Sequence, residues 1–78
     1  MNRIEIERAI VNIFNEEGYE VLNITENTIK AKKYIEAIYS YEVDNDKDII
    51  VIKNRQNRIV FEKYISSYQD LNVTVTID

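Results

Sequence analysis

The sequence predicts a single α+β domain in which helices pack on one face of an antiparallel sheet. Two observations predict this class. Near the N-terminus apolar residues recur at every third or fourth position, as on one face of a helix, and from Tyr19 onward they recur at every second position, as on one face of a strand. The expected order over residues 1–78 is an N-terminal helix, a three-stranded antiparallel meander, a second helix and a C-terminal strand.

The first helix is predicted over residues 3–17. Its apolar stripe consists of Ile6, Ala9, Ile10, Ile13 and Phe14. Asn2 is placed to cap the N-terminus of this helix, with Glu5 three residues later as in a capping box. Gly18 is placed to end the helix in the left-handed conformation.

Three strands are predicted next, over residues 19–24, 29–43 and 49–53. The odd-numbered positions of the second strand are apolar except Lys33, and the length of this strand predicts a bend or bulge near Lys33–Tyr34. Residues 31–38 also fit a short helix, but the β-rich residues that follow favour a strand. The third strand, "IIVIK", is an uninterrupted apolar run that is typical of a central strand.

The last part of the chain predicts one helix and one strand. After the polar "NRQN", apolar residues share one helical face over residues 58–70, and Asn57 is placed to cap this helix. The alternative for this segment is a hairpin that includes "RIVFEKY". The tail over residues 72–78, "NVTVTID", alternates and predicts a strand.

The composition excludes most catalytic chemistry. The chain has no His and no Cys, which removes the Ser-His and Cys-His nucleophile pairs, and its single Gly cannot build a phosphate-binding loop. We therefore expect a protein that is not an enzyme and that holds no cofactor and no metal. No apolar run approaches the roughly 18–20 residues of a membrane span, and the N-terminus is too charged for a signal peptide, so we expect a cytoplasmic protein without membrane contact.

The stretch "YEVDNDKDIIVI" places three aspartates at alternate positions of a predicted hairpin loop: Asp44, Asp46 and Asp48. This spacing resembles the start of a calcium-binding loop. The sixth position of such a loop needs Gly and holds Ile49, and the twelfth needs Glu and holds Arg55. Calcium in that geometry is excluded. The remaining interpretations are a polar turn and a surface for a cationic partner.

The net charge of −4 hides a segregation of charge. The basic residues form two clusters: Lys30, Lys32 and Lys33, and Lys53, Arg55 and Arg58. With Tyr34 for base stacking, these clusters support a second hypothesis, a small nucleic-acid-binding module. The overall acidity repels phosphate at a distance, so binding to free nucleic acid is expected to be weak or absent. A generic protein-interaction module is the third hypothesis.

Part of the chain, within residues 38–71, resembles the small acidic phage anti-CRISPR proteins that inhibit type II-A Cas nucleases as DNA mimics. The segments that carry the resemblance are an Asn-Asp hairpin loop, a Val-Ile strand, an "EKYIS" segment and an opening "GYEV": Asn45–Asp46, Val51–Ile52, Glu62–Ser66 and Gly18–Val21. The resemblance implies the order helix, three strands, helix, with "EKYIS" in the second helix.

The resemblance also implies a partner, a guide-loaded CRISPR effector nuclease or another defence nuclease in the infected or lysogenic bacterial host. Carboxylates would bind the Arg side chains with which such nucleases read the PAM. The candidate contacts lie on one hairpin: Glu42, Asp44, Asn45, Asp46 and Asp48. The family continues into a strongly acidic C-terminal helix, whereas this chain ends in the near-neutral "QDLNVTVTID". The identity of the target, the masking of its PAM-reading site and the oligomeric state therefore stay open.

Overall fold

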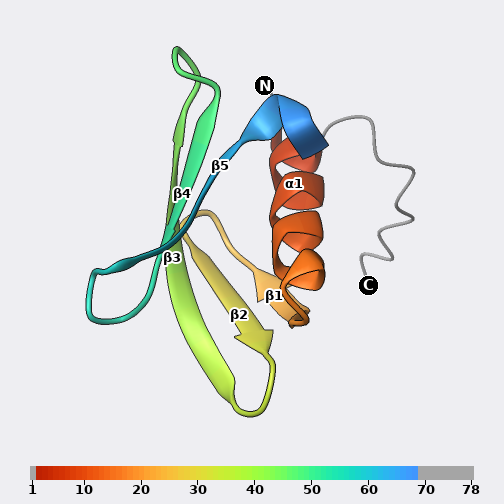
Figure 1. Cartoon of the computed structure of the whole chain (residues 1–78), viewed down its shortest axis with the longest axis vertical. Coiled ribbons are helices and arrows are strands. Elements are labelled where there is room, and N and C mark those ends of the chain that lie inside the picture. The colour runs from red at the N-terminus through yellow and green to blue at the C-terminus, as the bar shows by residue number, and fades with distance from the viewer. Residues whose placement is uncertain (1, 69–78) are drawn as a thin grey trace.

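The fold is one N-terminal helix packed against a five-stranded antiparallel sheet (Figure 1). The computed structural model describes residues 2–68. In chain order the elements are α1 (Arg3–Glu16), β1 (Glu20–Ile24), β2 (Thr28–Lys32), β3 (Glu36–Asp44), β4 (Ile49–Lys53), β5 (Ile59–Tyr64) and the 3-10 helix η1 (Ile65–Tyr68). Each strand pairs with the next, so the sheet has the order β1-β2-β3-β4-β5. The α+β class is right, but the predicted three-stranded meander and second helix are wrong.

The first helix and both of its caps are confirmed. The Asn2 side-chain oxygen accepts a hydrogen bond from the Glu5 N–H at 2.9 Å, which satisfies one of the free donors at the start of α1. Gly18 has a φ of 85°, a value that a side chain would strain, and the Tyr19 N–H then donates to the Phe14 carbonyl at 2.9 Å. The chain therefore leaves the helix by a sharp turn into β1.

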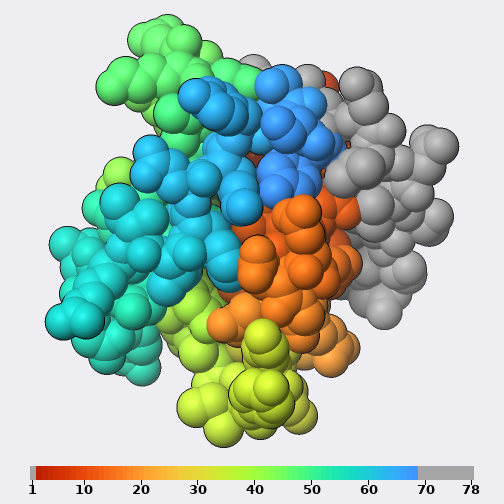
Figure 2. All heavy atoms as spheres, viewed as in Figure 1, coloured from red at the N-terminus to blue at the C-terminus, as the bar shows by residue number. Residues whose placement is uncertain are grey.

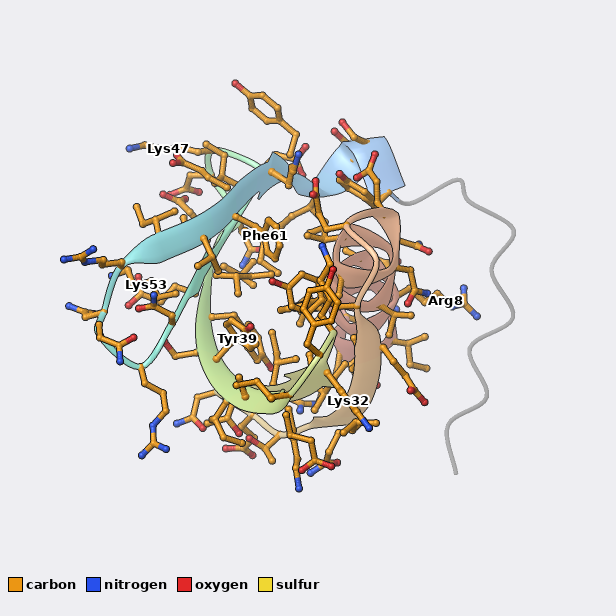
Figure 3. The ribbon with its side chains drawn as sticks, turned by 60° about the horizontal axis from the view of Figure 1, so that its bottom comes forward. Arg8, Lys32, Tyr39, Lys47, Lys53 and Phe61 are labelled. Carbon is orange, nitrogen blue, oxygen red and sulfur yellow. The ribbon has the colours of Figure 1, made fainter. Side chains whose placement is uncertain are left out.

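The core lies between α1 and one face of the sheet, which we call the inner face. The fully buried side chains come from α1, β2, β4 and η1: Ala9, Ile10, Ile13, Phe14, Ile29, Ala31, Ile50, Ile52 and Ile65. Phe14 is at the centre, because its ring meets three other aromatic rings edge-on at 5.2–5.4 Å, those of Tyr19, Tyr39 and Phe61. In Figure 3 Tyr39 and Phe61 point from the sheet toward α1.

The predicted long strand over residues 29–43 is wrong, because it is a hairpin formed by β2 and β3. The chain reverses at residues 33–35, where the sequence predicts only a bend or bulge, and Lys32 pairs with Glu36. The alternative short helix over residues 31–38 is not formed either. A three-residue turn keeps the odd-numbered residues on the inner face of both strands, so the apolar alternation runs unbroken through the reversal.

The predicted second helix over residues 58–70 is also wrong in the part that the structure describes. Residues 59–64 form β5, and "EKYIS" is divided between β5 and η1, so the order implied by the resemblance fails here. Asn57, the expected helix cap, instead has a φ of 62° in a hairpin turn, where the Asn54 side chain accepts from the N–H groups of Gln56 and Arg58.

Residues 59–64 form a strand because β4 needs a second strand to pair with. Without β5, the apolar β4 would be an edge strand with unpaired backbone groups. The β-branched and aromatic residues of "IVFEKY" also suit a strand better than a helix. The predicted C-terminal strand over residues 72–78 lies outside the described residues.

Tyr68 connects the end of η1 to the end of α1 through a side-chain hydrogen bond. The Tyr68 hydroxyl donates a hydrogen bond to Glu16 Oε2 at 2.8 Å, and burial together with this bond raises the pKa of Tyr68 to about 12. A folded-state pKa above the unfolded value of about 10 means that the folded chain holds this proton more tightly. Its contribution to stability is complete below pH 10 and is lost as the pH rises from 10 to about 12.

We therefore expect Tyr68→Phe to be less stable than the wild type at pH 8, because the hydrogen bond to Glu16 is lost. The difference in free energy of unfolding between the two proteins should shrink as the pH rises above 10, because Tyr68 then ionises in the unfolded wild type while it stays protonated in the folded one. Urea unfolding at pH 8, 10 and 11 measures this difference. A constant difference over this range would contradict the role of the Tyr68 proton.

Candidate protein-binding site

The sheet face opposite α1, which we call the outer face, has no covering element among the described residues. The strand register places its side chains in rows across β3, β4 and β5: Asp44, Ile49 and Tyr64; Glu42, Val51 and Glu62; and Ser40, Lys53 and Ile59. Apolar and charged side chains are neighbours on this face. Two of the apolar ones are largely open to solvent, since Tyr64 is 62% and Ile59 is 55% exposed. In Figure 3 Lys47 and Lys53 lie on the side of the sheet away from α1.

An acidic hollow of about 660 Å³ opens at one end of the outer face. The residues that line it come from the β3–β4 hairpin and from β5: Glu42, Val43, Asp44, Asn45, Asp46, Lys47, Ile49, Val51 and Glu62. Four carboxylates face one ammonium group, that of Lys47, and Ile49 and Val51 supply apolar contact surface. Figure 2 shows the tip of this hairpin (green) projecting from the body near β5 (blue).

The loop itself is a turn that Asp44 holds in shape. The Asp44 side-chain oxygen accepts hydrogen bonds from the N–H groups of Asp46 and Lys47 at 3.1 and 3.2 Å. This is an Asx turn, in which a carboxylate replaces the missing backbone partners of a reversing chain. The side chains of Asn45 and Asp46 are exposed at the tip.

Asp48 connects the hairpin to the distant start of η1. It has a φ of 57°, its carbonyl accepts from the Ile65 N–H at 2.8 Å, and its Oδ2 accepts from the Ser66 N–H at 3.1 Å. The backbone carbonyl and the carboxylate of Asp48 thus both accept hydrogen bonds from backbone N–H groups of the segment that follows β5. Asp48 is a structural residue, and it does not line the hollow.

The five residues that the sequence predicts as partner contacts do lie on one hairpin, but their roles divide. Glu42, Asn45 and Asp46 present side chains to solvent at the hollow, Asp44 both lines the hollow and holds the turn, and Asp48 ties the fold together. Sequence reasoning missed Glu62, which lies across Val51 from Glu42. The hairpin alternative for "RIVFEKY" would have placed Glu62 on the outer face.

The basic residues that the sequence groups into two clusters lie in two different hairpins. In the β2–β3 hairpin Lys30 forms an ion pair with Glu36 at 3.4 Å, and the Lys33 ammonium lies 5.4 Å from the centre of the Tyr19 ring. Lys53, Arg55 and Arg58 lie at the end of β4 and in the β4–β5 loop, and within residues 2–68 none of the three forms an ion pair. Tyr34, the predicted stacking residue, is 86% exposed at the tip of the β2–β3 turn.

Within residues 2–68, no three carboxylates gather as metal ligands. In the same part of the chain, no helix is long and apolar enough to cross a membrane. The chain matches no protein-family model, no curated protein and no solved structure.

Proposed function

We propose that this chain is a non-catalytic binding protein whose acidic hollow takes up cationic side chains of a nucleic-acid-processing enzyme. The observation that carries the proposal is the hollow itself, where four carboxylates from two separate segments lie around half-buried apolar side chains. Carboxylates bind guanidinium groups through paired, charge-assisted hydrogen bonds. A hollow that combines such acceptors with apolar surface suits arginine, whose planar head and aliphatic stem require both.

A bacterial defence nuclease, and first a guide-loaded type II-A Cas nuclease, is the partner that we propose. Such enzymes present arginine side chains to the DNA that they read, and an acidic protein surface can occupy those arginines in place of phosphate. The resemblance of the hairpin loop, with Asn45 and Asp46 at its tip, supports this partner. In this proposal the chain is a phage or prophage protein that acts in the cytoplasm of the host and hinders DNA engagement or cleavage.

The test pairs a binding measurement with a cleavage assay. The immobilised chain is exposed to guide-loaded type II-A nucleases, and cleavage of target DNA is measured with and without the chain. We expect Glu42→Lys combined with Glu62→Lys to weaken binding by at least about 100-fold, because each reversal sets a like charge against a cation of the partner. Inhibition of cleavage should be lost in parallel.

The matched control is Glu5→Lys combined with Glu17→Lys, which changes the net charge equally but on the α1 side of the sheet. This variant should bind like the wild type. Absence of saturable binding of the wild type to these nucleases at about 10 μM would overturn the proposed partner. Equal binding by both double variants would show that the hollow is not the site.

Free duplex and single-stranded DNA form the third arm of the measurement. Sub-micromolar binding to DNA alone, lost on Lys32→Glu with Lys33→Glu, would instead favour the nucleic-acid-binding module.

A further inference from the structure

The outer face carries opposite charges at its two ends. Glu42, Asp44 and Glu62 lie beside Ile49 and Val51, in the first part of β4. The bases follow at the other end of the same strand and in the loop after it: Lys53, Arg55 and Arg58. The strand β4 lies between β3 and β5. Following β4 from its first to its last residue therefore leads from the acidic end of the outer face to its basic end.

The outer face also presents apolar side chains among these charges. Val51 stands between the two glutamates, and Ile38, Ile59 and Tyr64 are 37%, 55% and 62% exposed around it. A second, smaller hollow of about 260 Å³ lies toward the basic end, with Arg55 in its lining. Each end of the face is therefore hollowed, one with carboxylates and one with a guanidinium group.

We propose that a second copy of this chain docks on the outer face, with the two β4 strands antiparallel about a two-fold axis that lies between the sheets. This rotation sets the acidic end of each copy against the basic end of the other, so symmetry forms the same ionic contact twice. The alternative two-fold axis, parallel to β4, sets carboxylates against carboxylates. Charge complementarity thus selects one of the two symmetric face-to-face arrangements.

The face is small for a dimer interface. Specific interfaces bury at least about 1,000 Å² in total, and a few short strands provide little more than this, so we expect a dissociation constant of about 10–100 μM. The dimer covers the acidic hollow. The second copy and the enzyme partner proposed above therefore compete for one surface, and the dimer goes beyond that proposal as a form in which the binding site is masked.

Sedimentation equilibrium of the purified chain between about 5 and 500 μM measures the dimer, a range that brackets the expected constant. Two double variants test its geometry. The acid-reversed variant carries Glu42→Lys and Glu62→Lys, and the base-reversed variant carries Lys53→Glu and Arg58→Glu. Each should be monomeric alone over this range, because both ends of the face then carry the same charge. An equimolar mixture should recover a heterodimer, because all facing charges are again opposite.

Arg8→Glu is the matched control, since Figure 3 places Arg8 beyond α1, on the other side of the molecule from Lys53. It should dimerise like the wild type. A wild type that stays monomeric at about 500 μM would overturn the proposal, and so would a mixture in which the two reversed variants stay monomeric. A monomeric wild type that still binds the nuclease leaves the proposed function in place. A dimeric wild type that binds no nuclease removes the proposed function alone.

Discussion

Phe14→Ala should lower the free energy of unfolding by about 3–5 kcal/mol, the usual cost of truncating a fully buried phenylalanine. Phe14 is 0% exposed, and three aromatic rings from β3, β5 and the α1–β1 turn meet it edge-on. These four rings hold the helix on the sheet, so the cavity would open where the two layers meet. Domains of this size lose roughly 4–8 °C in Tm for each kcal/mol, and we expect a fall of at least about 12 °C.

Tyr34→Ala is the matched control for this prediction. Tyr34 is an aromatic residue of similar size, but it is 86% exposed, and its removal should change the free energy of unfolding by less than about 0.5 kcal/mol. Thermal unfolding followed by circular dichroism measures both variants. A fall in Tm of only a few degrees for Phe14→Ala would show that α1 is not packed on the sheet through this ring.

Asp48→Ala should cost about 2–4 kcal/mol of stability, although the residue stands in the exposed acidic loop. The substitution removes the acceptor of the Ser66 N–H, and bonds to a charged group contribute about 1.5–3 kcal/mol. It also places Ala at a φ of 57°, a left-handed conformation that costs a further 1 kcal/mol or so. The start of η1 would keep only the backbone bond from the Ile65 N–H to the hairpin.

Three further substitutions separate these two effects. Asp48→Asn keeps an acceptor and tolerates the left-handed conformation, and should cost less than about 1 kcal/mol. Asp48→Gly relieves the backbone but loses the bond to Ser66, and should lie between the Asn and Ala variants. Asp46→Ala, two residues away at the exposed tip, should be nearly silent. Urea unfolding gives all four values, and equal effects at positions 46 and 48 would refute the structural role of Asp48.

The elements that local sequence determines were predictable. The helix has an apolar stripe, a capping Asn2 and a terminal Gly18, and all three signals lie within the helix or next to it. The strand at 49–53 and the hairpin loop before it were predictable for the same reason, since an apolar run adjoins a cluster of turn-forming residues. The loop placed Glu42, Asn45 and Asp46 together without any knowledge of the fold.

The β2–β3 hairpin could not be recognised in the sequence because of the length of its turn. When three residues separate paired positions, residues of the same parity face the same way before and after the turn, so period two continues as in one long strand. In the β3–β4 hairpin the inner-face residues change from odd to even, as from Val43 to Ile50, and the interruption is visible in sequence. Only the pairing of β2 with β3 distinguishes a hairpin with a three-residue turn from one long strand.

The segment that forms β5 and η1 was misassigned because its core-facing residues fit both the helical and the strand period. Phe61, Ile65 and Tyr68 recur at four and three positions as on a helix, yet they belong to a strand followed by a 3-10 turn. The deciding factor is the open edge of β4, which is a property of the assembled sheet. The same misassignment concealed Glu62, since a helical Glu62 has no reason to lie beside Glu42.

The contact of Tyr68 with Glu16 spans 52 positions, whereas each strand pairs with its immediate neighbour in the chain. Neighbouring hairpins need only short loops to close and form quickly, so the sheet can assemble progressively from its local pairs. The packing of the helix must wait, because Phe61 and Ile65, which complete the surroundings of α1, are among the last described residues to be synthesised. On the ribosome the helix would thus emerge first and complete its packing only when β5 and η1 have left the exit tunnel.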